Sequence, residues 1–222
     1  MLHSDFLQFL YDLSQNNNRD WFEKNKKRYE ASVKKPFEGL VGEVIERLRA
    51  FEPGFQIQPK DCIHRIYRDT RFSADKTPYK THVSAVFTQK GRQTMEQPGY
   101  YLHMEFGNLT LGGGAYFLEK EPLAKVRTAI AQDPEAFRSL VFEKNFAEKY
   151  GEIKGEKNKV LPPEFKEAAK KEPFLANKQF YFMTELEPEI SLRPQLADFV
   201  ADYFRAGRAL NEFLRKAIGV NK

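Results

Sequence analysis

The apolar residues change their spacing twice along the chain, and this pattern limits the fold classes open to it. Residues 6–51 and 194–218 carry apolar residues three or four positions apart, which is the spacing of one helical face. Between residues 62 and 117 apolar residues alternate with polar ones, as in strands with one buried face. Helices that flank a run of strands predict an α+β fold, with a largely antiparallel sheet covered by N-terminal and C-terminal helices.

Local signals set the expected ends of the helices. Ser4 is a good N-cap for a first helix, and Asn18 for a second. Pro36 permits a new helix or a kink, while Pro53 and Gly54 end the N-terminal helical region. The other expected helices cover 121–132, 134–143, a short segment opened by Pro162 and Pro163, and a long helix from Pro194.

The expected strands are 62–68, 83–88, 100–106, 109–117 and 179–186. Gly107 and Asn108 are compatible with a two-residue hairpin turn, which favours antiparallel pairing. For the run Gly112 to Gly114 we favour a bulge or a close backbone approach over a phosphate loop, because no Lys and Ser or Thr follow it. Residues 144–159 carry both signs of charge in near balance, and we interpret them as a solvated face or excursion.

Length and composition agree with one domain. A chain of 222 residues with 41% apolar residues can bury a substantial core, and we expect residues 1–222 to form a single α+β domain. The single cysteine, Cys62, cannot form an internal disulfide, and we expect a small buried side chain in a reducing compartment. Residues 1–15 lack signal-peptide features, and no apolar run reaches the roughly 18 residues of a membrane span. We therefore expect a cytoplasmic protein without membrane contact.

The densest cluster of charge lies in RDTRFSADKTPYKTH, residues 68–82. A connection between antiparallel strands would place its cations at one rim of the sheet, where arginine and lysine suit phosphate or carboxylate oxygens. The candidate ligand-binding residues are Arg65, Arg68, Arg71, Lys76 and Lys80. In the competing interpretation, Asp69 and Asp75 pair with cations of the loop and hold it in place. The sequence supports the two interpretations equally.

His103 and Glu105 are two positions apart on an expected strand and therefore share a face, and His82 ends the charged loop. These three residues are the candidates for proton transfer, and the sequence leaves open whether the chain is an enzyme. They could also share a metal, with His82 or His64 as a third ligand. We expect no metal and no other cofactor, because no HExxH motif is present and the chain has only 4 histidines.

Among functions, we favour binding of a small anionic ligand, such as a phosphorylated one, in a groove bordered by residues 68–82. The alternative is a non-enzymatic protein-interaction domain in which the loop is a structural charge network, and a hydrolase or a nucleic-acid binder ranks lower. A net charge of +5 permits an acidic partner. The basic residues of 19–35 alternate with aromatic residues at core spacing, however, so we do not expect nucleic acid as a partner. No oligomeric state is predicted.

The block RDTRFSADKTPYKTH resembles the signature of a family of conserved hypothetical proteins of bacteria and fungi, a domain of unknown function. Further blocks agree in order: FLQFLYDLSQNNNRDWFEKNKKRYE, YYLHMEFGNLTLGGGAYFLEKEPLAKVRTAI, and KVLPPEF with NKQFYF. The resemblance covers nearly the whole chain. It implies a single α+β domain, and it brings no substrate, cofactor or catalytic residue.

Overall fold

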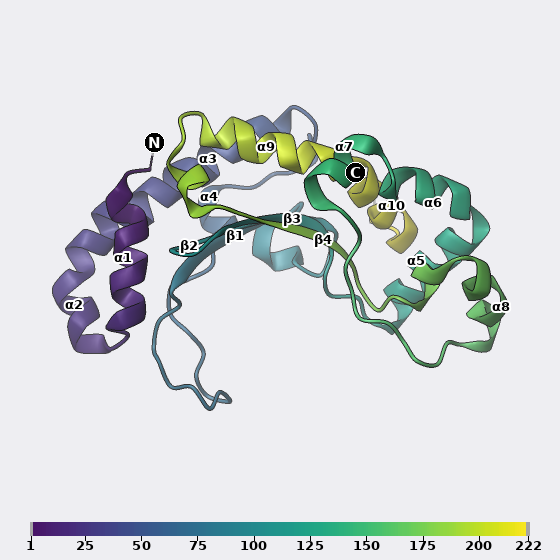
Figure 1. Ribbon diagram of the computed structural model, residues 1–222, viewed down its shortest axis with the longest axis horizontal. Helices are drawn as coiled ribbons and strands as arrows, with labels where there is room; N and C mark the ends of the chain where they lie inside the picture. The colour runs from purple at the N-terminus through teal and green to yellow at the C-terminus, as the bar shows by residue number, and fades with distance from the viewer. Residues whose placement is uncertain (1, 221–222) are drawn as a thin grey trace. The chain divides into compact units, whose positions relative to one another are not determined.

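The alternating segment in the middle of the chain forms an antiparallel sheet of four strands in the order β1-β2-β3-β4. The strands are β1 (His82–Phe87), β2 (Gly99–Glu105), β3 (Leu109–Ala115) and β4 (Phe180–Leu186). The structure, a computed structural model, describes residues 2–220 (Figure 1). It confirms the predicted α+β class.

The N-terminal helices begin close to their expected positions. They are α1 (Ser4–Gln15), α2 (Arg19–Arg28) and α3 (Lys35–Arg49), and the π-helical segment Tyr29–Lys34 joins α2 to α3. Asn18 caps α2 as predicted, since its side chain accepts a hydrogen bond of 2.9 Å from the Trp21 N–H. Ser4 is instead the first residue of α1, and the N-cap position falls on His3, which makes no side-chain capping bond.

The C-terminal half departs from the prediction at two places. Residues 144–159 are more than a solvated excursion, because α7 (Lys144–Tyr150) buries Phe146 and Tyr150. The long helix expected from Pro194 is two helices, α9 (Leu196–Ala206) and α10 (Arg208–Ile218). The other elements are α4 (Pro59–Cys62), α5 (Lys120–Gln132), α6 (Pro134–Val141), α8 (Pro163–Lys171) and the 3-10 segments Gly91–Thr94, Pro173–Ala176 and Pro188–Leu192.

The expected strand 62–68 does not form a continuous ladder. It makes only isolated antiparallel bridges, from Ile63 to Ala85 and from Tyr67 to Tyr79. Ile63 and Tyr67 are four positions apart, whereas their partners are six positions apart (85 − 79), so the two arms differ in length and cannot stay in register. Main-chain bonds still hold the arms together, among them Lys80 N–H to the Ile66 carbonyl at 2.8 Å.

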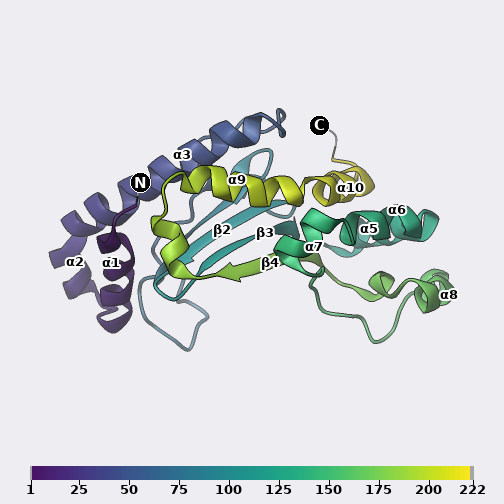
Figure 2. The same ribbon diagram turned by 45° about the horizontal axis from the view of Figure 1, so that its top comes forward.

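The two faces of the sheet differ in burial. On β2, Leu102 and Met104 are fully buried, whereas Tyr101, His103 and Glu105 are half-buried. α3 and the start of α9 lie on one side of the sheet, and the loop before β1 extends from the other side (Figures 1 and 2). The predicted candidates His103 and Glu105 therefore point away from the helices.

The described chain divides into two compact units. One contains the described part of residues 1–93 with 101–111 and 185–201, and the other contains 94–100, 112–184 and the described part of 202–222. Within the second unit, a continuous apolar core includes Phe137, Phe180 and Phe182. Because β2, β3 and β4 contribute residues to both units, neither is a contiguous stretch of sequence. A single domain over residues 1–222 remains a prediction.

Candidate functional site

Three of the predicted residues meet on the half-exposed face of the sheet. The rings of His82 on β1 and His103 on β2 stack, with centroids 4.2 Å apart and an interplanar angle of 27°. Nε2 of His103 lies 3.5 Å from Oε2 of Glu105. One ligand atom from each of these side chains lies within 4.8 Å of the other two. The antiparallel pairing of β1 with β2 produces this grouping, since it brings the start of β1 against the end of β2.

Neighbouring side chains orient His103 and Glu105. The Tyr101 hydroxyl hydrogen-bonds to Nδ1 of His103 over 3.1 Å. Oε1 of Glu105 accepts a 2.7 Å hydrogen bond from the amide of Asn108, whose own oxygen accepts one of 2.9 Å from the Thr110 hydroxyl. With Nδ1 and Oε1 occupied in this way, Nε2 of the imidazole and Oε2 of the carboxylate face each other.

Burial and nearby positive charge favour the neutral form of both imidazoles. The pKa of His82 falls to about 4, first through burial and then through His103, Lys80 and His64. Burial also lowers the pKa of His103, and Glu105 only partly opposes that change. The His82 ring is therefore uncharged at pH 7, and for His103 burial favours the neutral ring while Glu105 and Glu185 favour the charged one.

Three of the five predicted ligand-binding cations are engaged inside the loop. The Arg68 guanidinium contacts the Asp75 carboxylate and the Thr77 hydroxyl. Asp75 also accepts a 2.9 Å hydrogen bond from the Thr77 N–H, and its pKa falls to about 2 because of that bond and the contact with Arg68. Arg68 thus closes the base of the loop onto itself.

Arg71 and Lys76 complete this internal network. Arg71 donates two hydrogen bonds to the Asp69 carboxylate, at 3.0 and 2.7 Å. The Lys76 ammonium donates to the Thr70 carbonyl at 2.9 Å. Because the Arg71 side chain is 76% exposed, its pair with Asp69 is a surface pair. The loop does pair its own charges, as the competing interpretation anticipated; the Arg71–Asp69 pair does so in solvent, whereas the Arg68 side chain is only 25% exposed.

Lys80 and Arg65 differ from the other three cations. Neither forms an ion pair with any residue in the described range 2–220. The pKa of Lys80 is lowered first by burial and then by the positive charges of Arg65 and Arg92. The same environment lowers the pKa of His64 to about 4, through burial, Lys80 and Arg92. Lys80, Arg65 and Arg92 thus form a positively charged cluster around the neutral ring of His64, and Lys80 also acts on His82.

Sequence reasoning missed Arg92. This residue follows Gly91, whose φ of +58° suits glycine, and its guanidinium donates to the main-chain carbonyls of Lys60 and Asp61 at 2.9 and 3.2 Å. A side chain at Gly91 would be excluded as well, since its Cβ would lie 2.4 Å from the Asp61 oxygen. In the sequence, the only sign of this contact is that a glycine precedes an arginine. That pattern does not show which distant segment the two residues contact.

The fold and this site define the class: an α+β protein whose antiparallel sheet carries two imidazoles and a carboxylate on its half-exposed face, with positive charge from the segments that flank β1. Residues 5–213 match the model of the conserved hypothetical protein (DUF2461) family, and the chain belongs to that family, as the sequence resemblance predicted. Neither the curated proteins nor the solved structures yield a match. Within residues 2–220, no helix combines the length and apolar character needed to cross a membrane.

Proposed function

We propose that the protein binds a small anionic ligand, such as a phosphate ester, at the base of the 68–82 loop. The observation that carries this proposal is the contrast among the five predicted cations. Arg68, Arg71 and Lys76 direct their donors to groups of the loop itself. Lys80 and Arg65 are the two left without an ion pair in the described part of the chain. The proposed contacts are therefore Lys80 and Arg65, while the other three cations shape the loop and Arg92, which donates to the Lys60 and Asp61 carbonyls, adds positive charge nearby.

The physical argument is one of charge balance. Lys80 is half-buried, and the two charges that act on it, those of the exposed Arg65 and Arg92, are both positive. Like charges repel more strongly where water is partly excluded, because the effective dielectric constant is lower there. An anion between these groups replaces the repulsion with attraction, and an arginine fork gives it two parallel hydrogen bonds.

The test compares the melting of the wild type with that of Lys80→Ala and Arg71→Ala, each with added inorganic phosphate or a panel of phosphorylated metabolites at constant ionic strength. A ligand that binds only the native state stabilises it by about 2.7 kcal/mol at 100 times its Kd. We expect phosphate to raise the Tm of the wild type and of Arg71→Ala, and the shift to disappear in Lys80→Ala. An equal loss in both variants, or no shift in the wild type, contradicts the proposal.

A second candidate is a non-enzymatic interaction domain in which the loop contacts a protein partner. One observation favours it: Phe72 is 95% exposed at the loop, with the Arg71 guanidinium carbon 5.7 Å from its ring centroid. An aromatic ring next to an arginine is a frequent pair in protein interfaces. Phe72→Ala should leave the phosphate response intact, so the two functions are separable.

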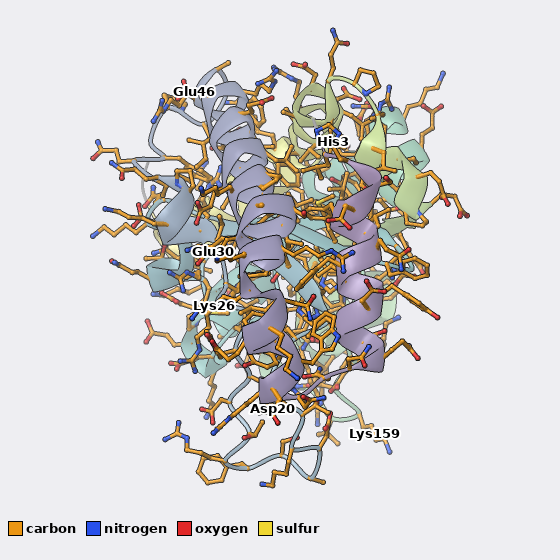
Figure 3. All side chains as sticks on the ribbon, turned by 90° about the vertical axis from the view of Figure 1, so that its left-hand side faces the viewer. His3, Asp20, Lys26, Glu30, Glu46 and Lys159 are labelled. Atoms are coloured by element: carbon orange, nitrogen blue, oxygen red, sulfur yellow. The ribbon has the colours of Figure 1, made fainter. Side chains whose placement is uncertain are left out.

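The other functions predicted from the sequence have less support than the two above. His82, His103 and Glu105 stay our candidates for proton transfer, so a hydrolase is still a proposal. A nucleic-acid surface along residues 19–35 has less support, because Asp20 and Glu30 interrupt the exposed basic residues such as Lys26 (Figure 3). A cytoplasmic location also remains a proposal, supported by a single cysteine.

A further inference from the structure

We propose that His82, His103 and Glu105 form a binding site for one divalent transition-metal ion, with Zn²⁺ the ion that fits best. Two imidazoles and one carboxylate are a donor set that zinc accepts, and three protein ligands leave a fourth position open for water or a ligand. The sequence-based expectation of no metal relied on the missing HExxH motif and on the lack of an evident third ligand. Pairing of β1 with β2 places His82 as that ligand.

The distances suit a small ion after a modest movement of side chains. Zinc–nitrogen and zinc–oxygen bonds of about 2.0–2.1 Å in a tetrahedron place ligand atoms about 3.3 Å apart. Nε2 of His103 and Oε2 of Glu105 are already at 3.5 Å. The ligand atoms of the three residues lie within 4.8 Å of one another, so the widest pair has to close by no more than about 1.5 Å. The stacked rings of His82 and His103 must also splay apart as their nitrogens turn toward the ion, and rotation of the half-buried side chains is the movement that the proposal requires.

A supporting shell of hydrogen bonds is already in place. When Nε2 of His103 binds a metal its proton resides on Nδ1, and the Tyr101 oxygen stands 3.1 Å away to accept it. Asn108 holds Oε1 of Glu105 at 2.7 Å and leaves Oε2 for the metal. Such outer partners fix the tautomer of a ligating histidine and the orientation of a ligating carboxylate.

The charges around the site have both signs. Lys80 acts on both imidazoles as a positive charge, and His64 is a nearby neutral ring. Glu105 and Glu185 act on His103 as negative charges. A divalent ion therefore meets the carboxylates of Glu105 and Glu185 and the ammonium group of Lys80, around which Arg65 and Arg92 add positive charge. Because the zinc site uses residues other than Lys80 and Arg65, it does not depend on the proposed anion binding.

The test is zinc binding by the full chain, produced without a polyhistidine tag, stripped with a chelator and titrated calorimetrically in phosphate-free buffer. We expect about one Zn²⁺ per chain in the wild type, as a single three-ligand site requires. Binding should be lost in His82→Ala and in His103→Ala. His64→Ala is the matched control, since it removes a half-buried imidazole outside the ligand set and should bind zinc normally.

Two further measurements distinguish a metal site from a structural role of the same side chains. Tyr101→Phe should weaken zinc binding about 10- to 100-fold, because it removes the acceptor for Nδ1–H without removing a ligand. Co²⁺ should give the intense visible absorption of a low-coordinate site in the wild type and in His64→Ala, at higher Co²⁺ concentration in Tyr101→Phe, and not in His82→Ala or His103→Ala. Circular dichroism and melting without metal establish that each variant is folded. Absence of stoichiometric zinc in the wild type, or undiminished binding in His82→Ala and His103→Ala, overturns the proposal.

Discussion

At the scale of single residues, one buried amide shows how a helix supports the sheet. Asn211 is fully buried; its side-chain oxygen accepts a 3.0 Å hydrogen bond from the Gly114 N–H, and its amide donates one of 2.9 Å to the Gly99 carbonyl. Gly114 has a φ of +95°, and a Cβ there would lie 2.3 Å from the Phe180 oxygen. The glycine run thus permits a close backbone approach, as the sequence predicted, and Asn211 completes the hydrogen bonds there.

Replacing Asn211 should be costly. Asn211→Ala leaves a buried N–H and a buried carbonyl without their partner, and each such group costs about 1–3 kcal/mol, so we expect a loss of roughly 2–4 kcal/mol. Urea denaturation measures this change, with Asn16→Ala as a control. The Asn16 amide lies in solvent and donates to the Asp12 carbonyl, and its removal should change stability by less than about 0.5 kcal/mol. Similar losses in the two variants would show that the bridge from Asn211 contributes little.

At the scale of elements, the break between α9 and α10 has a packing cause. The chain leaves the helix at Gly207, where a Cβ would lie 2.3 Å from the tip of the Phe182 ring. Phe182 is fully buried in the core of the second unit, so it has little room to move. The apolar spacing continues across Gly207, which explains why the sequence predicts one long helix from Pro194.

Gly207 and Gly39 should respond oppositely to replacement by alanine. Gly207→Ala forces a methyl group against the Phe182 ring, and overpacking of this kind costs about 1–3 kcal/mol. Gly39→Ala, on the exposed side of α3, meets nothing within 4 Å and should raise stability by about 0.5–1 kcal/mol through helix propensity. Denaturation curves of the two variants provide the comparison. If Gly207→Ala instead raises the stability, close packing against Phe182 is not the reason for the break between α9 and α10.

At the scale of the whole molecule, acid sensitivity is spread over carboxylates that the fold keeps ionised. Pairing with arginine or lysine is the largest cause for six of them, and main-chain hydrogen bonds are the largest cause for Asp75 and Glu143. The carboxylates with lowered pKa values are Asp5, Asp12, Asp69, Asp75, Glu121, Glu143, Glu156 and Asp198. They occur in both units. The protein should therefore lose stability as the pH falls, first below about 6.5, where the unfolded chain binds protons that His64 and His82 take up only near pH 4, and further through the carboxylates below about pH 4.

Arg28 and the two carboxylates that it contacts, Asp5 and Asp12, provide a test of this expectation. Hydrogen bonds from Arg28 lower the pKa of both carboxyl groups below the ordinary value of 3.8. A depressed pKa in the folded state stabilises the protein above the unfolded pKa, and this stabilisation is lost as the pH falls through the folded value. We expect the free energy of unfolding to fall below about pH 4 in the wild type, and less steeply in Arg28→Gln. Parallel slopes for the two proteins would contradict the role of Arg28.

Much of the fold follows from patterns that are local in the sequence. Three- and four-residue apolar spacing predicts α1, α3 and α5, and alternation predicts β2, β3 and β4, because each period describes one face of one element. Asn18 predicts the start of α2 from its own side chain. At the site, the common face of His103 and Glu105 follows from the two-residue period of a strand.

Long-range pairing determines the rest, and local spacing does not encode it. His82 joins His103 because β1 pairs with β2, and Arg65 and Lys80 gather beside His64 through the path of the two arms before β1. The two arms differ by two residues between their bridges, which removes the strand predicted over 62–68. Register and close packing depend on which distant segments meet. The tertiary structure therefore decides which side chains converge on the site, whereas the sequence pattern determines the face on which each one lies.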